Sequence, residues 1–236
     1  MVYTKGRVQV RSAKQRAKPF IATVIVEKPK RKTSDIKFSV DTKEDRRELF
    51  AELEKDALST NWDYKENIEF LQSRDHALVS LLALTGLRIQ EALMLKAKQF
   101  KIRRDRIRLI SAKTLKRGME RSNITLPKKG ALAPLTFIFE EWLLQVPNPE
   151  CYIFPSARFG VQWDTPLGTT RAFWIIKATT GKFPHWYRAV CETVYGKLVY
   201  HNDPWKLKKF MGLQRLESTV PYVSTEGKEA ETLFKL

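Results

Sequence analysis

Hydrophobic residues recur every three or four positions over four stretches of the chain, which is the period of an amphipathic helix. They predict helices over residues 44–58, 64–84, 134–145 and 167–180. A break at Thr85-Gly86 ends the second helix, and a further helical pattern begins directly after it. Thr165 and Pro166 are typical of an N-cap and first turn, so we expect them to begin the last helix.

The period changes to two at Arg106, where Ile107 and Leu109 alternate with residues that face the other way. Residues 115–120 read as a turn and 122–127 as the returning strand, which together predict a β-hairpin. The hairpin is basic, because residues 101–130 hold eleven Lys and Arg against two acidic residues. The predicted fold class is therefore α+β and mainly α, with one small antiparallel sheet.

The net charge of the chain indicates what kind of partner it binds. The 236 residues include 43 Lys and Arg against 26 Asp and Glu, a formal net charge of +17. Such an excess destabilises a compact state unless a polyanion or counterions screen it, and nucleic acid is the commonest polyanion. Residues 1–37 alone carry eleven basic and two acidic side chains. We interpret residues 1–45 as a basic arm, with residues 20–26 as a possible strand, and residues 46–236 as the main domain with a tail from 223.

Other classes of protein fit poorly. No apolar run approaches the roughly 20 residues that span a bilayer, and no apolar signal-peptide core follows the basic N-terminus. Cys151 and Cys191 form no CxxC motif and only three His are present, so we expect neither a disulfide framework nor a metal site. These features predict an intracellular protein that works without a membrane, a metal or another cofactor.

Four segments occur in an order that resembles the catalytic domain of tyrosine recombinases, the phage-type integrase family. The resemblance covers roughly residues 45–225. Residues 84–93 read LTGLRIQEAL, like the first arginine box of the family, and residues 111–113 (SAK) end a hairpin strand where the family places a lysine. Residues 184–188 read PHWYR, like the His-x-x-Arg box, and residues 210–222 read FMGLQRLESTVPY, like the C-terminal box with its tyrosine ten positions after the glycine.

The resemblance implies a role for each of these residues. Arg88 and Arg188 would bind the phosphoryl oxygens, because guanidinium is planar, always charged and bidentate. Tyr222 would be the nucleophile, and His185 would accept or relay its proton. Lys113 would protonate the departing 5′ oxygen. Glu91 would orient the basic cluster, and Lys116, Arg117 and Arg121 on the hairpin would bind DNA.

Leu213 departs from the family pattern, because the residue directly after the glycine is usually His or Trp and donates a hydrogen bond to the phosphate. Leucine cannot donate, and losing one such donor typically costs about 10²–10³ in rate. Either Gln214 or His201 substitutes for it, or the enzyme is slow, or the chain no longer recombines DNA. We expect Leu213→His to raise the cleavage rate.

The leading hypothesis is site-specific cleavage and rejoining of DNA through a 3′-phosphotyrosyl intermediate, for integration or excision of an archaeal or viral mobile element. Double-stranded DNA and a homotetramer assembled on it are the implied partners. No metal is required, because the arginines replace it, and no nucleotide, because the phosphotyrosine bond conserves the energy. The rivals are a type IB topoisomerase-like activity and a DNA-binding protein of the same fold that has lost the chemistry. A basic RNA-binding protein comes last, because no RNA-module motif is present.

Overall fold

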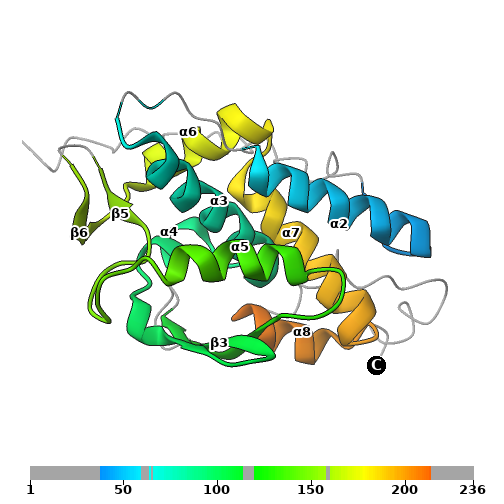
Figure 1. The fold of residues 1–236 in the computed structure, drawn as a ribbon. Helices are drawn as coiled ribbons and strands as arrows, with labels where there is room; N and C mark the ends of the chain where they lie inside the picture. The colour runs from blue at the N-terminus through cyan, green and yellow to red at the C-terminus, as the bar shows by residue number, and fades with distance from the viewer. Residues whose placement is uncertain (1–37, 60–63, 65, 114–119, 158–159, 214–236) are drawn as a thin grey trace, which may run out of the picture. The chain divides into compact units, whose positions relative to one another are not determined.

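The structure is a computed structural model that describes residues 38–59, 64, 66–113, 120–157 and 160–213. All of them belong to one compact unit, Ile36–Leu236. The elements of this unit follow one another along the chain as drawn in Figure 1: α2 (Lys43–Leu58), α3 (Ile68–Thr85), α4 (Ile89–Leu93), the 3-10 helix η2 (Ala97–Gln99), β2 (Phe100–Ile102), β3 (Arg106–Lys113), β4 (Glu120–Pro127), α5 (Ala133–Leu143), β5 (Pro155–Ser156), β6 (Gln162–Pro166), α6 (Thr169–Thr180), α7 (Pro184–Val194), the π-helical turn η3 (Tyr195–Val199) and α8 (Pro204–Met211).

Helix α3 is the centre of the hydrophobic core. Every residue from Ala77 to Thr85 is buried, as expected for a helix that is apolar on all sides. Helices α2, α5 and α7 pack around it. Helix α2 begins at a capping box in which Thr42 and Asp45 satisfy each other's backbone N–H groups, and it turns Leu49 and Leu53 inward.

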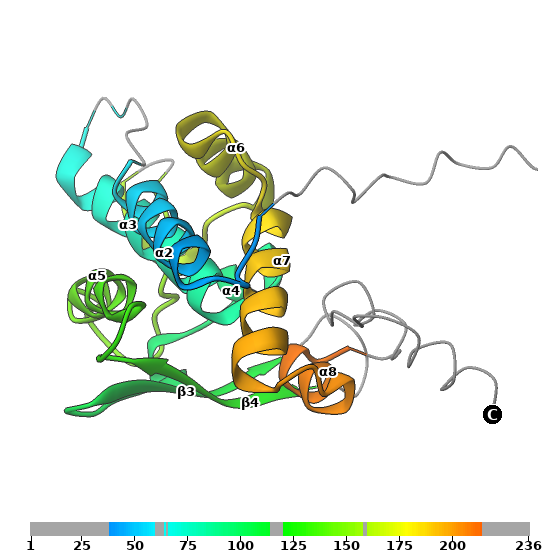
Figure 2. The same cartoon turned by 90° about the vertical axis from the view of Figure 1, so that its right-hand side faces the viewer.

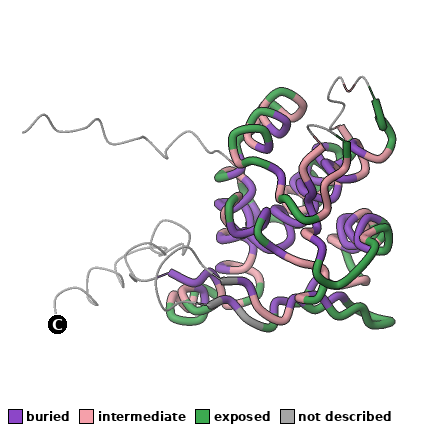
Figure 3. The backbone as a smooth tube through the Cα atoms, turned by 90° about the vertical axis from the view of Figure 1, so that its left-hand side faces the viewer, coloured by how far each residue is buried: buried purple, intermediate pink, exposed green. Residues whose placement is uncertain are grey.

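The sheet lies beneath α5 and has the order β2-β3-β4, with both pairs antiparallel (Figure 2). The two-residue repeat of the strands puts Ile107 and Leu109 on the buried face, opposite Leu126 and Ile124 of β4. At one end of the sheet, α8 packs against β4. At the end farthest from α8 the sheet is exposed (Figure 3), and residues 101–106 are all accessible to solvent.

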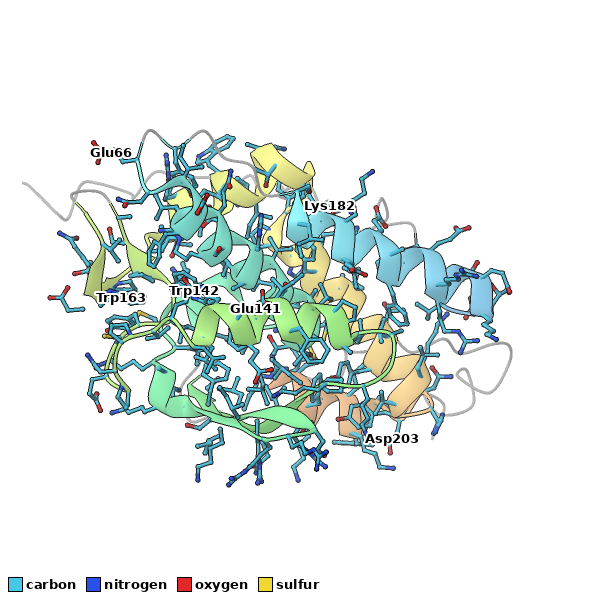
Figure 4. The ribbon with its side chains drawn as sticks, in the orientation of Figure 1. Glu66, Glu141, Trp142, Trp163, Lys182 and Asp203 are labelled. Atoms are coloured by element: carbon cyan, nitrogen blue, oxygen red, sulfur yellow. The ribbon has the colours of Figure 1, made fainter. Side chains whose placement is uncertain are left out.

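A second, smaller sheet pairs β5 with β6. Trp163 of β6 stacks on Trp142 of α5 with ring centroids 6.0 Å apart, and both are labelled in Figure 4. The indole N–H of Trp142 donates to the carbonyl of Ile153 at 2.6 Å, so the aromatic side chain is both buried and satisfied. These contacts fix the chain between α5 and α6.

The predicted elements are mostly confirmed, with differences at their ends. Helix α3 starts at Ile68, four residues later than predicted, because Asn67 adopts a left-handed conformation (φ 52°) that stops the helix there. Thr165 and Pro166 do not begin α6. They lie in β6, where Pro166 ends the strand, and Gly168 is the N-cap instead.

Two parts of the sheet structure had no signal strong enough to predict them. Strands β2 and β5 are only three and two residues long, too short for a period to be recognised. The predicted strand over residues 20–26 and most of the hairpin turn lie outside the described residues. Within the described part of the chain, no helix is long and apolar enough to cross a membrane.

Candidate active site

The loop after α3 positions Arg88. Helix α3 ends at Thr85 with Gly86 as its C-cap, and Arg88 is the N-cap of the short helix α4. The buried carboxylate of Glu91 holds Arg88 at two points: Oε2 accepts from the backbone N–H at 3.0 Å and Oε1 accepts from Nη1 at 2.7 Å. The side chain of Arg88 is nevertheless 28 % exposed. Glu91 therefore orients an arginine that a ligand can still reach.

Gly86 is required at its position for two reasons. Its φ of +58° is the left-handed conformation that L side chains rarely adopt. In addition, a Cβ there would lie 2.9 Å from Cβ of Cys191 and 2.9 Å from Cε of Met211. The loop that carries Arg88 can approach α7 and α8 this closely only because residue 86 lacks a side chain.

Arg188 projects from α7 into the space beside this loop and is only 3 % exposed. Its Nη1 donates to the carbonyl of Gly86 at 2.6 Å and its Nη2 donates to the carbonyl of Met211 at 3.2 Å. Its Nε contacts the carboxylate of Glu192 at 3.0 Å. The guanidinium is thus fixed in orientation by contacts with three parts of the chain: the loop between α3 and α4, helix α7 and helix α8.

Arg88, Arg188 and His185 form one electrostatic cluster, although 100 residues of sequence separate the two arginines. Burial lowers the pKa of Arg188, and the positive charge of Arg88 lowers it further. Partial burial lowers the pKa of the His185 imidazole below its usual 6.5, and Arg188 and Arg88 add to this effect. A lowered pKa favours the uncharged imidazole, which is the form able to accept a proton.

The sequence prediction for Arg121 differs from what the structure shows. We expected this residue to contact DNA, but its side chain is 1 % exposed. Its Nε donates to the carbonyl of Phe210 and its Nη2 to the carbonyl of Thr85, both at 2.6 Å. Arg121 belongs to β4, against which α8 packs, and its buried guanidinium has no access to a DNA phosphate in this conformation.

Of the remaining predicted residues, Lys113 and His201 lie within the described part of the chain. Lys113 is the last residue of β3 and pairs with Glu120 in the register of the hairpin. Tyr222, Lys116, Arg117 and Gln214 lie outside the described residues, so their roles remain predictions. His201 is exposed in the turn that precedes α8.

Leu213 packs in a small apolar cluster. It is 8 % exposed and belongs with Leu207 and Met211, against the half-buried side chains Tyr195, Tyr200 and Phe210. Tyr195 and Phe210 stack with their ring centroids 4.1 Å apart. Leu213, which departs from the family pattern, therefore contributes to the apolar packing around α8.

Glu192 is a site residue that the sequence did not single out. It is 3 % exposed and lies one helical turn after Arg188, with its carboxylate paired to that arginine. The i,i+4 spacing of an acid and a base on a helix is a weak signal, because most such pairs are solvent-exposed. Only the burial of α7 makes this pair part of the site.

The exposed end of the sheet forms a second basic feature, which we call the arginine face. It surrounds a cavity of about 420 Å³ lined by Arg103, Arg106, Arg108, Asn123 and Thr125. Lys101 of β2 lies directly opposite Arg108 of β3, and like charges in this position destabilise a sheet. Figure 4 shows side chains with nitrogen tips projecting from this face into solvent. An anion bound there would relieve the repulsion.

Neither region resembles a metal centre. In the described ranges, no group of three or more His, Cys, Asp or Glu side chains is arranged to hold a metal ion. Arg88 and His185 are the members of this cluster that an oxyanion can reach, because Arg188 is buried in this conformation and is held by two carbonyls and Glu192. Arg88 can bind an oxyanion, and His185 can accept a proton beside it.

Solved structures of DNA recombinases share this architecture. The XerH site-specific recombinase bound to its difH substrate in a pre-cleavage complex gives a TM-score of 0.57 at 17 % identity, over 80 % of this chain and 52 % of XerH. The Tn1549 transposon integrase in complex with circular intermediate DNA gives 0.51 at 15 % identity, over 78 % and 64 %. XerA recombinase gives 0.50 at 19 % identity, over 84 % and 65 %. No protein-family model and no curated protein matches the sequence.

These likenesses establish the fold. The chain has the fold of the tyrosine recombinase catalytic domain, mainly helical with a small antiparallel sheet, and this prediction from the sequence is confirmed. The chain spans about half the length of the XerH chain that it matches.

Proposed function

We propose that this chain cleaves and rejoins DNA at specific sites through a covalent bond between Tyr222 and a 3′ phosphate. The observation that carries the proposal is the contact of Arg188 with the loop that carries Arg88, close to His185, on the fold of a catalytic domain whose solved relatives include DNA-bound recombinases. Guanidiniums can stabilise the charge on phosphoryl oxygens and an imidazole can accept a proton, so these groups suit a phosphoryl transfer.

In the proposed reaction, the phenolic oxygen of Tyr222 attacks the phosphorus and the bond from phosphorus to the 5′ oxygen breaks. His185 accepts the phenolic proton, and Lys113 gives a proton to the departing 5′ oxygen. Arg88 and Arg188 stabilise the negative charge that builds on the non-bridging oxygens. The reverse steps, with the 5′ hydroxyl of another strand as nucleophile, rejoin the DNA and release the tyrosine.

DNA is the proposed partner for electrostatic reasons as well. The net charge of +17 and the exposed arginine face both suit a polyanion. We further propose that copies of the chain assemble on DNA, because strand exchange needs cleavage of more than one strand. The proposed role in moving a mobile element follows from strand exchange between two sites.

Covalent trapping tests the proposal. The protein would be mixed with supercoiled DNA that contains the sequence flanking its own gene, quenched with detergent and analysed for a protein–DNA adduct. We expect an adduct on Tyr222 that is absent from Tyr222→Phe and present in Tyr152→Phe, a tyrosine outside the proposed site. Tight DNA binding without an adduct would refute the proposed chemistry. Cleavage at many unrelated sequences would favour a type IB topoisomerase-like activity instead.

Leu213 favours a second candidate, a DNA-binding protein of this fold that has lost the chemistry. A buried leucine provides no hydrogen bond to a phosphate. The variant Leu213→His separates the candidates, because it restores a donor at the cost of apolar packing. A single-turnover cleavage rate that rises by about 10²-fold would show a slow enzyme. A variant that folds, binds DNA and still forms no adduct would favour the DNA-binding protein.

A further inference from the structure

We propose that Arg121 is a positioning residue of the active site, which sets the hairpin that carries Lys113 against the ends of α3 and α8. The inference rests on the proposed function, because Lys113 has a role only if the chain cleaves DNA. It adds a residue that touches no substrate and yet determines where the proton donor lies.

The first support is the pair of backbone carbonyls that Arg121 joins. Its guanidinium donates to Thr85, the last residue of α3, and to Phe210, one residue before the end of α8, each at 2.6 Å. The last four carbonyls of a helix have no partner within the helix and carry the negative end of its dipole. One cation therefore satisfies two helix ends that lie 125 residues apart in sequence.

The second support is that Arg188 repeats this arrangement one residue further along both segments. Arg188 donates to the carbonyls of Gly86 and Met211, the neighbours of the two that Arg121 binds. The two arginines thus make parallel cross-links between the end of α3 and the end of α8. We call these four hydrogen bonds the double clamp. Arg188 belongs to α7, whereas Arg121 connects the clamp to the hairpin.

The third support is the position of Arg121 within the hairpin. In the register of the sheet it lies opposite Ala112, and the next pair along is Lys113 with Glu120. Because neighbouring residues of a strand are about 3.3 Å apart, a displacement of Arg121 is transmitted directly to the backbone of Lys113. A displacement of about 1 Å at a reacting group can reduce a rate by about 10²-fold.

The fourth support is the cost of keeping Arg121 in place. Its guanidinium lies over the ring of Phe210 at 4.9 Å, and its Nη1 is buried with no hydrogen-bond acceptor among the described residues. Burial lowers the pKa of Arg121 to about 10, so the group remains charged at neutral pH. Burying a cation with an N–H group that lacks an acceptor costs free energy of desolvation, and an arginine kept at that cost points to a role in geometry.

Hydrogen exchange of backbone amides tests the link without requiring cleavage. In Arg121→Met, we expect amides of residues 207–213 and of the paired strand ends 111–113 and 120–122 to exchange about tenfold faster. Amides of α2 and α5 should keep their wild-type rates. The control Arg47→Met removes an exposed arginine of α2 and should change neither set. A uniform increase over α2, α5 and β4 would show a purely stabilising residue and overturn the inference, as would no change at all.

Cleavage of a modified substrate tests the consequence. At saturating DNA we expect Arg121→Met to bind DNA with the affinity of Arg47→Met and to cleave it about 10²-fold more slowly. On DNA with sulfur in place of the bridging 5′ oxygen, the leaving thiolate needs no proton donor. The deficit of Arg121→Met should then disappear, as a misplaced Lys113 requires. A deficit of equal size on the sulfur substrate would overturn the assignment.

A further variant guards against loss of folding. Arg121→Lys keeps the charge, but its single ammonium cannot reach both carbonyls with the fork geometry of guanidinium. We expect it to show the same local exchange and the same rescue by sulfur. If wild-type protein forms no adduct with any DNA, the proposed function fails, while the exchange experiment still decides whether Arg121 links the hairpin to α8.

Discussion

Arg188 and Glu192 form a buried ion pair on α7, with Nε and Oε1 3.0 Å apart and each side chain 4 % exposed. A carboxylate this close offsets much of the charge that Arg188 would offer to a phosphate. Glu91 pairs with Arg88 in the same way. Each arginine of the candidate site is therefore accompanied by a carboxylate before any ligand binds, which keeps the two guanidiniums together despite their mutual repulsion.

Glu192→Gln should destabilise the protein by about 3 kcal/mol, because removing one partner of a buried pair leaves the other charge uncompensated. Urea unfolding measures this change as a lower midpoint. Glu141→Gln is the matched control, because Glu141 lies exposed on α5 (Figure 4) and its replacement should shift the midpoint little. Equal midpoints for the two variants would mean that the Arg188–Glu192 pair contributes nothing to stability.

Gly86→Ala should prevent stable folding or lower the free energy of unfolding by more than about 2 kcal/mol, since it combines a left-handed backbone with close contacts to Cys191 and Met211. Gly130→Ala provides the comparison. Gly130 has a φ of +79° but no atom within 4 Å of an added Cβ, so it isolates the backbone cost of about 1 kcal/mol. Thermal unfolding measures both variants. Equal melting temperatures would contradict the expected cost of the close contacts at residue 86.

The arginine face should contribute to DNA affinity through phosphate contacts. Replacing Arg103 and Arg108 together by Gln is expected to weaken binding and to reduce the slope of log K against log salt by about 0.9 per contact, or about 1.8 in total. Fluorescence anisotropy at several salt concentrations measures the slope. Lys55→Gln on α2 serves as a control for the loss of an exposed charge. A slope that stays at the wild-type value would exclude the arginine face from the interface.

The cleavage rate should depend on the protonation of His185. Because burial and the two arginines lower its pKa, the imidazole remains neutral down to a pH below 6.5. The single-turnover rate should therefore be constant around neutral pH and fall tenfold per pH unit only below that inflection. His185→Gln should be slower and lack the inflection. An inflection above 6.5 in the wild-type profile would contradict the role of His185 as the neutral proton acceptor.

Local patterns were sufficient for most of the fold. The period of about 3.6 predicted α2, α5 and α6 to within two residues, and the period of two predicted β3 and β4. Glu91 three residues after Arg88 is again a local relationship, and the structure shows both of its hydrogen bonds. The count of Lys and Arg over residues 101–130 also predicted that the hairpin is basic, but it did not show which basic side chains remain exposed.

The sequence by itself determined helices α2 to α6, the hairpin and the boxes that resemble the recombinase family, because these depend on residues close together in the chain. Only the tertiary structure decided that Arg121 is buried, since its acceptors lie 36 and 89 residues away. It also decided that Glu192 faces Arg188 in the interior and that α8 packs against β4 while the arginine face stays open. Burial depends on which elements pack together, and the positions of charged residues along the chain do not indicate that packing.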